Sequence, residues 1–376
     1  MAEKTQWQSW KVGELSKGCK LCVKGRKTVL FATGLCSKKT MCYYCPIADT
    51  RSGKDVAYAN ETKIDSAIGL IEEIRICSSE GIGITGGDPL MKINKTIEFI
   101  NSVKKEFGKG FHVHLYCPME LVSDERLKKL NDAGLDEIRF HLDIENKDMW
   151  HKLELAKFFR WKIGVEIPVI PGNEKKYAEL IEFVKGKVDF LNMNELEMSD
   201  SEVCKISERG FEAKSEFSYA VNGSEDSALS LLKNCNGINV HYCTVKLKDD
   251  VQIVNRLRNR LKNVRRQFDE VKDYHLIRGA VYTRELKPSF GYRKVLENIQ
   301  NKANVLNNLE IKKNELAKKL SIKKELFFVD KIKPRILTSQ NIVKKFKDHI
   351  KSMGLIPAIV EELPSGDEFE IDIDFL

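Results

Sequence analysis

The stretch Gly34-Leu-Cys-Ser-Lys-Lys-Thr-Met-Cys-Tyr-Tyr-Cys-Pro46 gathers three cysteines in one short run. Cys36, Cys42 and Cys45 have the spacing C-x5-C-x2-C. Three thiolates this close together can bind one metal centre, and thiolates are the usual ligands of iron–sulfur clusters. Because the run lacks a fourth cysteine, a four-iron cluster held here would have one iron open to a small molecule. A structural zinc site is the alternative that three cysteines alone leave open.

A second motif, Gly83-Ile-Thr-Gly-Gly-Asp-Pro89, follows further along the chain. Together the two motifs resemble the radical S-adenosylmethionine (SAM) superfamily. That family usually has C-x3-C-x2-C, an aromatic residue before the last cysteine, and then Gly-Gly-Glu-Pro. Here Tyr44 is the aromatic residue, the first spacer is longer, and Asp88 replaces Glu. The segment Thr85-Gly-Gly-Asp-Pro-Leu90 is similar to the activating enzymes of glycyl-radical proteins such as pyruvate formate-lyase.

The resemblance implies a cofactor pair and a reaction. Cys36, Cys42 and Cys45 would hold a [4Fe–4S] cluster, and SAM would chelate its open iron. One electron from the reduced cluster would cleave SAM to methionine and a 5′-deoxyadenosyl radical, which would remove hydrogen from an unidentified substrate. The resemblance also implies an electron donor of the flavodoxin or ferredoxin type.

The same resemblance implies further cofactor contacts. Tyr44 would pack near the adenine, and Gly86 and Gly87 would let the backbone approach SAM closely. Asp88 and Pro89 would complete this segment, with Asp88 as its acidic member. Taken by itself, the segment would be an ordinary strand-to-helix turn.

Strand-like runs recur in the first half of the chain and alternate with helix-period segments. After the first run, they begin about every 25 to 30 residues, as successive βα units do. This alternation predicts parallel strands joined by right-handed helical crossovers. The expected strands are 28–33, 81–85, 111–116, 137–142, 162–170 and 188–193. The residues expected to cap or open the intervening helices are Asp65, Asn94, Ser123, Asn146 and Asn173.

Six βα units are too few for a closed eight-stranded barrel, and the resemblance implies an α/β fold with a partial (β/α)6 TIM-like barrel over residues 28–200. In barrel-like folds the chemistry gathers at the carboxyl ends of the strands. The cysteine run follows the first expected strand and Gly86-Gly87 follows the second, so both should lie on one rim. Other polar candidates for that rim, most of them expected to be structural, are His141, Asp143, Glu166, Asn192, Asn194 and Glu195.

The N-terminal segment, 1–27, contains Cys19-Lys-Leu-Cys22 between two glycines, a pattern typical of a metal knuckle. One knuckle is half of a four-ligand site, and Cys235 and Cys243 are the other close couple. We therefore expect a second site from Cys19, Cys22, Cys235 and Cys243, holding zinc or an auxiliary iron–sulfur cluster. Two separate pairs are the alternative, and Cys204 could replace one ligand.

We expect structural roles for the remaining histidine and cysteine residues that could in principle bind a metal. His112 and His114 alternate along the third expected strand and so point to one face, which we expect to be half-exposed. We expect Cys77, Cys117 and Cys204 to be buried free thiols.

The remaining residues, 201–376, are expected to form a basic C-terminal extension, because 376 residues exceed one ordinary core. Residues 201–244 look irregular. Helical patterns cover 249–274 and 291–320, and a small α+β unit should follow, with strands 325–329, 355–360 and 368–375 around a helix at 340–353.

The positive charge is uneven along the chain. The net charge is +8, and residues 245–350 hold 27 Lys and Arg against 12 Asp and Glu. This excess could attract an anionic or RNA substrate, or it could be a solvated helical surface. A second function class therefore stays open, a zinc-stabilised RNA-binding module without catalysis.

The sequence also bears on location. No apolar run reaches the length of a membrane span, and the N-terminus has no apolar signal segment. We therefore expect a cytoplasmic protein. In that setting, the ten cysteines favour metal ligation over disulfides.

Overall fold

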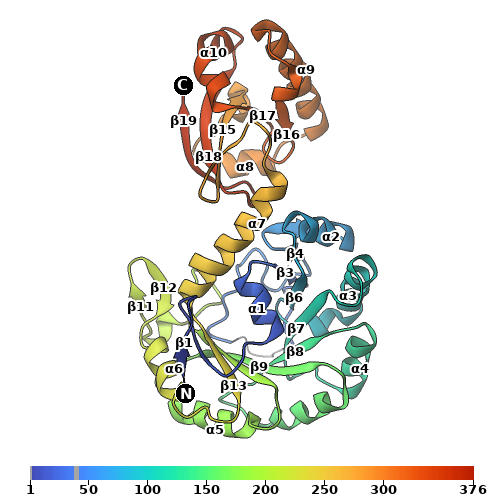
Figure 1. Ribbon diagram of the computed structural model, residues 1–376, viewed down its shortest axis with the longest axis vertical. Coiled ribbons are helices and arrows are strands. Elements are labelled where there is room, and N and C mark those ends of the chain that lie inside the picture. The colour runs from blue at the N-terminus through green and yellow to red at the C-terminus, as the bar shows by residue number, and fades with distance from the viewer. Residues whose placement is uncertain (1, 38–41) are drawn as a thin grey trace. The chain divides into compact units, whose positions relative to one another are not determined.

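The computed structural model describes residues 2–37 and 42–376 (Figure 1). The chain divides into two compact units, Met1–Arg256 and Leu257–Leu376. The first unit is built on an eleven-stranded sheet in which seven neighbouring strands run parallel. In spatial order these strands are β3 (Lys27–Phe31), β6 (Gly81–Thr85), β7 (His112–Pro118), β8 (Glu137–His141), β9 (Lys162–Val169), β10 (Phe190–Glu195) and β13 (Asn239–Cys243).

The α/β class and the partial TIM-like barrel are confirmed. All six predicted strands form, and β13 is a seventh parallel strand beside β10, within a segment that we expected to be irregular. Its short run hides the pattern, because His241 interrupts two buried apolar residues, Val240 and Tyr242. The first compact unit therefore extends past residue 200 to Arg256.

Antiparallel strands extend both sides of the parallel set, and helices cover its outer face (Figure 1). The added strands are β4 (Ala57–Ala59) and β5 (Thr62–Ile64) beside β3, and β2 (Trp10–Val12) and β1 (Glu3–Lys4) beside β13. The α-helices between the parallel strands are α2 (Ala67–Ile76), α3 (Ile93–Phe107), α4 (Asp124–Asp132), α5 (Glu174–Val184) and α6 (Ser224–Leu232).

The helix starts only partly follow the predicted caps. Ser123 caps α4 by accepting a hydrogen bond from the backbone N–H of Arg126 at 3.4 Å, and Asn173 precedes α5. The prediction for Asp65 was wrong by one residue, since α2 follows Ser66. The prediction for Asn94 was also wrong, because it lies inside α3.

The fourth predicted helix differs in type as well as in start. Residues Trp150–Phe158 form a 3-10 helix, η2, and Asn146 precedes it. The Asn146 side chain accepts a hydrogen bond from the backbone N–H of Asp148 at 2.9 Å, which makes a local turn in place of a helix start.

The two faces of the parallel sheet differ in chemistry. Outward residues such as Ile82, Leu115 and Phe140 are fully buried against the helices. The inner face is polar, and its buried members include Lys27, His112, His114, Glu137, Arg139, Asn192 and His241. The expectation of a half-exposed histidine face was therefore wrong.

A short helix, α1 (Lys17–Val23), lies against this polar inner face. A Cβ added at Gly18 would come within 2.4 Å of Arg139 Nη2 and 2.6 Å of His114 Nδ1. Ser16 caps the helix by accepting a hydrogen bond from the backbone N–H of Cys19 at 3.2 Å. Cys19 and Cys22 therefore stand on a helix at the interior of the barrel, whereas we expected a loop-like knuckle.

The second unit is an antiparallel sheet with helices on one face. Its strands in spatial order are β16 (Phe328–Asp330), β17 (Arg335–Thr338), β15 (His275–Tyr282), β18 (Ile356–Glu362) and β19 (Glu370–Phe375), with β14 (Glu270–Lys272) paired to β15. Leu309 and Leu316 of α9 (Lys302–Leu320) and Val343 of α10 (Gln340–Ser352) pack against Val281 and Ile336 of the sheet. A small α+β unit is thus present, larger than predicted because β15 and β17 were missed.

The two helices predicted at 249–274 and 291–320 are shorter than expected. Residues Leu247–Ile253 form a π-helical turn, α7 (Val254–Val264) follows, and the chain then enters β14. The pattern over 291–320 forms two helices, α8 (Tyr292–Glu297) and α9.

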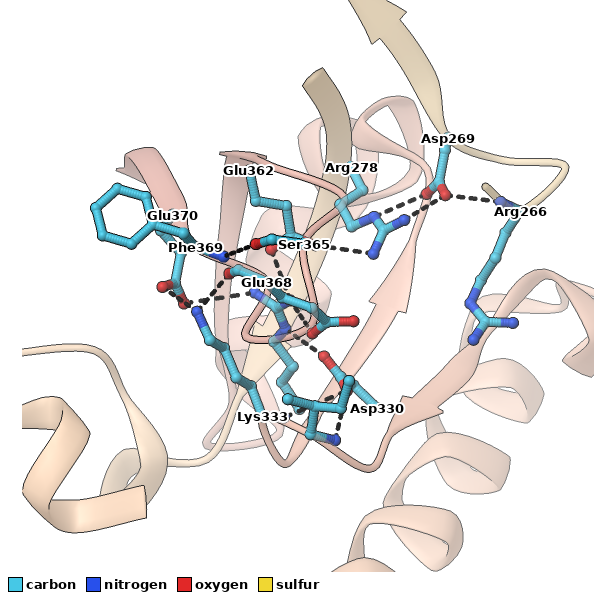
Figure 2. Close-up of polar contacts among 12 residues, drawn as sticks. Arg266, Asp269, Arg278, Asp330, Lys333, Glu362, Ser365, Glu368, Phe369 and Glu370 are labelled. Atoms are coloured by element: carbon cyan, nitrogen blue, oxygen red, sulfur yellow. Dashed lines mark hydrogen bonds and ion pairs between the residues drawn. The ribbon is translucent and has the colours of Figure 1, made fainter. Parts of the chain in front are cut away.

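Charged side chains fill part of the interior of the second unit (Figure 2). Arg335 is fully buried, and its guanidinium donates to Asp330 Oδ2 at 3.0 Å, Glu362 Oε2 at 2.7 Å and Glu368 Oε2 at 3.2 Å. Arg278 bonds Asp269 and also reaches Glu362 Oε1 at 2.8 Å. Glu362 therefore joins two buried arginines in one network.

Within the parts of the chain that the structure describes, no helix is both long and apolar enough to cross a membrane.

Candidate active site

A cavity of about 550 Å³ lies at the carboxyl ends of β3, β6, β7 and β8. The two sequence motifs meet there, because Cys36, Cys42 and Cys45 line it together with Gly86 and Gly87. The prediction that both motifs share one rim is borne out by this geometry. Several apolar side chains complete the wall, among them Phe31, Ile47 and Pro118.

The side chains of the three cysteines face one space. Burial raises the pKa of Cys45, and the neighbouring Cys42, Cys36 and Cys204 raise it further. Among residues 2–37 and 42–376, no three His, Cys, Asp or Glu side chains are already arranged to hold a metal ion. The donor set nevertheless suits an iron–sulfur cluster, because three thiols line a cavity that is otherwise largely apolar.

The glycine pair has a packing role that the sequence did not reveal. Gly86 has φ +148°, and a Cβ there would lie 2.3 Å from the carbonyl oxygen of Thr33. At Gly87, a Cβ would lie 2.2 Å from the carbonyl oxygen of Leu35. The backbone N–H of Gly87 donates to Thr33 at 2.8 Å. Only glycine lets the end of β6 pack this closely against the segment leading to Cys36.

Asp88 and Pro89 do not line this cavity. Asp88 is fully buried and caps the 3-10 helix η1 (Pro89–Lys92), with Oδ1 accepting from the backbone N–H of Leu90 at 2.9 Å. Burial raises the pKa of Asp88 to about 6. In this structure the acidic member of the motif shapes the turn, and its contact with SAM stays a prediction.

Tyr44 connects the cysteine run to the strand ends. Its hydroxyl lies 2.9 Å from His141 Nε2, and His141 Nδ1 lies 3.3 Å from the carbonyl oxygen of Glu166. Burial raises the pKa of Tyr44, and the nearby Cys42 raises it further. Both ring systems line the cavity, so the His141 prediction of a rim residue holds.

A second cavity, of about 430 Å³, adjoins the first on the inner face of the barrel. The two cavities share Tyr44, Pro46, Thr85, Tyr116 and His141 as lining residues. The second is also lined by charged and nucleophilic side chains, namely Cys22, Lys27, Arg139, Glu166, Glu195, Glu197 and Lys248.

The predicted polar rim residues divide between the cavities and other roles. Glu166, Asn194 and Glu195 line the second cavity. Asn192 is buried beside them, donating to Glu166 Oε2 at 2.8 Å. Asp143 accepts a hydrogen bond from the backbone N–H of Glu145 at 2.9 Å and so supports its own loop.

Arg139 is the central charge of the inner face. It donates to Glu137 Oε1 and to Glu166 Oε2, each at 2.6 Å, and to the Tyr116 hydroxyl at 3.1 Å. Burial by itself would raise the pKa of Glu166, but Arg139 and two asparagine amides hold it below its usual range. The sequence signal that was missed is the alternation in Glu137-Ile-Arg-Phe-His141, where polar residues occupy every second position of a strand expected to be buried.

Lys27 stands at the floor of the second cavity. Its Nζ lies 2.8 Å from His112 Nδ1. Burial lowers the pKa of Lys27 to about 7, an effect that the nearby Cys22 and Glu137 only partly oppose. Burial also lowers the pKa of His112 and His114, so both imidazoles are neutral.

Cys19 and Cys22 of α1 face different surroundings. Cys19 Sγ accepts from Asn192 Nδ2 at 3.2 Å and from Arg139 Nη2 at 3.6 Å. Although burial opposes it, Arg139 and a hydrogen bond with His241 lower the pKa of Cys19 to about 7. Burial raises the pKa of Cys22 to about 11.

The predicted second metal site is not assembled from its four cysteines. Cys243 lies on the inner side of β13. Burial raises its pKa, and Cys19 and Cys22 are close enough to raise it further by electrostatic repulsion. Cys235 instead follows α6 in the helical layer, where its Sγ donates to the Leu231 carbonyl at 3.3 Å. Nearness of Cys235 and Cys243 in sequence was misleading, because the chain passes from the outer layer to the inner face between them.

Taken together, the partial barrel and its thiol-lined rim define a cofactor-dependent enzyme of the α/β class. The family model of the radical SAM superfamily matches residues 31–184. A Methanocaldococcus jannaschii protein, provisionally named a glycyl-radical enzyme activating enzyme, is 45% identical over 279 residues, covering 71% of this chain and 74% of that protein. The chain belongs to the radical SAM superfamily and is related to the activating enzymes.

Other similarities have lower sequence identity. GTP 3′,8-cyclase of Aliarcobacter butzleri is 28% identical over 163 residues, covering 39% of this chain and 48% of the cyclase. Among solved structures, Streptococcus suis SuiB bound to S-adenosylmethionine is 12% identical with a TM-score of 0.39, covering 58% of this chain and half (50%) of SuiB. Methylornithine synthase has a TM-score of 0.36 at 15% identity, covering 59% of this chain and 71% of the synthase.

Family membership decides between the two function classes. The protein is a radical SAM enzyme whose cofactors are a [4Fe–4S] cluster and SAM. The alternative of a zinc-stabilised RNA-binding module without catalysis has no support from the family or the relatives.

Proposed function

We propose that Cys36, Cys42 and Cys45 hold the [4Fe–4S] cluster and that the enzyme removes hydrogen from a polypeptide substrate. The observation that carries the first half is the cavity that these thiols share with Gly86 and Gly87. The polypeptide is supported by the relative with 45% identity, whose name places its action on another enzyme.

Bound there, the cluster and SAM would supply one-electron cleavage of SAM and, through it, hydrogen abstraction from the substrate. The chain's own residues position the reactants and exclude water. Gly86 and Gly87 keep the backbone of the β6 end free of side chains beside the thiols. Phe31, Ile47 and Pro118 give the cavity apolar walls, which protect a reactive radical from solvent.

The second cavity is the place for the reacting group of the substrate. It lies directly beyond the residues that it shares with the first cavity, among them Tyr44 and His141. Its charged lining, with Arg139 between Glu137 and Glu166, can orient a polar group of the substrate by hydrogen bonds.

A one-electron donor of the flavodoxin or ferredoxin class completes the reaction as its partner. The second unit favours an acidic surface on a partner, because residues 257–376 hold 25 Lys and Arg against 17 Asp and Glu. This difference equals the formal net charge of +8 of the whole chain.

The test is anaerobic reconstitution of the full chain with iron and sulfide, followed by SAM and a chemical reductant. We expect four irons and four sulfides in the cluster that binds SAM, and production of 5′-deoxyadenosine. Cys42→Ser should abolish the nucleoside, whereas Cys235→Ser, at a buried thiol in the helical layer, should retain it. Equal 5′-deoxyadenosine from wild type and Cys42→Ser would contradict the proposed ligand set.

A further inference from the structure

The thiol of Cys22 faces the space where the substrate would react. Cys22 lines the second cavity, together with Tyr44 and His141, which also line the cofactor cavity. The proposed chemistry of cluster and SAM gives this thiol no task. Its pKa, raised by burial to about 11, keeps it protonated, so it holds a hydrogen atom to give.

A second thiol stands one helical turn before it. Residues at i and i+3 of a helix are neighbours, and their Cα separation suits a disulfide. Cys19 is buried, and its sulfur accepts from Asn192 Nδ2 and Arg139 Nη2. These donors stabilise negative charge on Cys19. One member of the pair is thus a thiol beside a cavity, and the sulfur of the other accepts two N–H hydrogen bonds that favour its thiolate form.

We propose that Cys22 is a hydrogen-atom donor to the radical formed in the second cavity, and that Cys19 is its redox partner. This inference rests on the proposed radical chemistry of the neighbouring cavity. The proposal gives α1, which packs against the inner face of the barrel, a catalytic role in addition to its structural one.

The step balances as follows. The S–H bond of Cys22 breaks homolytically, a C–H bond forms on the radical carbon, and a thiyl radical is left. The thiyl radical and the Cys19 thiolate join as a disulfide radical anion. The oxidised form of the flavodoxin- or ferredoxin-class electron donor accepts the extra electron and leaves a disulfide. A dithiol reductant then restores the pair with two electrons and one proton.

The consequence concerns the product. A thiol S–H bond is weaker than an ordinary C–H bond, so transfer to a carbon radical runs downhill. A donor beside the substrate would quench the substrate radical and leave a closed-shell product. The Cys19–Cys22 pair therefore favours a closed-shell, modified polypeptide as the product when the substrate radical is an ordinary carbon radical.

The experiment needs no identified substrate. Reconstituted full-length protein is incubated in D2O with SAM and a ferredoxin reduced without thiols, whose oxidised form can accept the released electron, so that the 5′-deoxyadenosyl radical takes hydrogen from the nearest donor. Thiols exchange their hydrogen with solvent, so transfer from Cys22 places deuterium in 5′-deoxyadenosine. Mass spectrometry measures that deuterium, and peptide mapping measures a Cys19–Cys22 disulfide in the protein.

We expect wild type to give deuterated 5′-deoxyadenosine with disulfide rising in step. Cys22→Ser and Cys22→Ala should lose most of the deuterium and all of the disulfide, while Cys235→Ser matches wild type. Undeuterated nucleoside from wild type, or equal deuterium in the Cys22 variants, would overturn the proposal. Absence of 5′-deoxyadenosine from every protein would instead refute the proposed function, so the two failures are distinguishable. If the Cys22 variants do not fold, the wild-type deuterium and disulfide still decide.

Discussion

Both units of the molecule bury an arginine among carboxylates, but the two arginines have different surroundings. Arg139 contacts Glu137 and Glu166 and lines a cavity on the inner face of the barrel. Arg335 is fully buried on β17, and its partners Asp330 and Glu362 come from β16 and β18 of the second unit.

The comparison shows two uses of buried charge. In the second unit the charges satisfy one another, and Glu368 ties the turn between β18 and β19 to the Arg335 guanidinium. In the barrel, the same kinds of groups border open space, where a ligand can replace or join their partners. Buried ion pairs hold structure in one unit and border a cavity in the other.

The largest effect should follow from removing the enclosed arginine. Arg335→Met would leave Asp330, Glu362 and Glu368 without their shared cation, and losing one partner of a buried pair costs about 3–5 kcal/mol. All four tryptophans, Trp7, Trp10, Trp150 and Trp161, lie in the first unit. For Arg335→Met, circular dichroism should therefore show that part of the secondary structure, that of the second unit, is lost at lower denaturant than in wild type. The midpoint of tryptophan fluorescence, which reports on the first unit, should stay unchanged.

The matched control is the exposed Arg284 of the second unit, changed to methionine. It should leave both signals unchanged. If the Arg335→Met variant unfolded at the wild-type midpoint by both circular dichroism and fluorescence, the Arg335 network would contribute no net stability.

A smaller effect is expected from the arginine beside the cavity. Arg139→Met should destabilise the first unit by about 1–3 kcal/mol, the cost of leaving buried polar groups unsatisfied. The loss is limited because Glu166 keeps Asn192 at 2.8 Å and Asn194 at 3.0 Å, and water can enter the cavity. Tryptophan fluorescence in denaturant measures it, with exposed Arg160→Met as control. If Arg139→Met lowered the free energy of unfolding as much as Arg335→Met does, the two buried arginines would not differ in their contribution to stability.

The smallest effect concerns one carboxyl group of the second unit. Burial and the neighbouring Asp330 raise the pKa of Glu368 well above its usual 4.5. A raised folded-state pKa contributes stability that is complete below 4.5 and is lost as pH rises through the folded-state pKa. The change is at most about 1.4 kcal/mol for each pH unit.

Glu368→Gln removes this dependence, because the amide stays neutral. The variant should match wild type in acid and gain on it progressively toward alkaline pH, as followed by circular dichroism in denaturant. Exposed Glu325→Gln provides the control. A variant less stable than wild type at alkaline pH would show that Glu368 is ionised and paired with Arg335.

Several features were predictable because they depend on local pattern. The six strands of the barrel carry apolar residues on their helix-covered face, so their runs stand out in the sequence. The meeting of the cysteine run with Gly86 and Gly87 followed from parallel strands, whose carboxyl ends share an edge. Ser123 was recognisable as a cap because a cap acts within one turn of its own helix.

Other features depend on contacts between distant segments and were missed. β13 escaped notice because it is short and because His241 faces the polar interior. The four-cysteine site failed because sequence spacing does not say which layer a residue occupies, and Cys235 lies in the helical layer. The placement of α1 inside the barrel has no local signal, since it depends on Gly18 fitting beside Arg139 and His114.

The sequence by itself therefore determined the superfamily, the cofactors and the parallel α/β core, because short motifs and periodic burial are written in neighbouring residues. Only the tertiary structure decided which thiols face which space. It placed Cys22 beside the second cavity, Cys19 among N–H donors, and Cys235 in the helical layer. The physical reason is that strand pairing and helix insertion bring together residues whose separation along the chain carries no information about their distance.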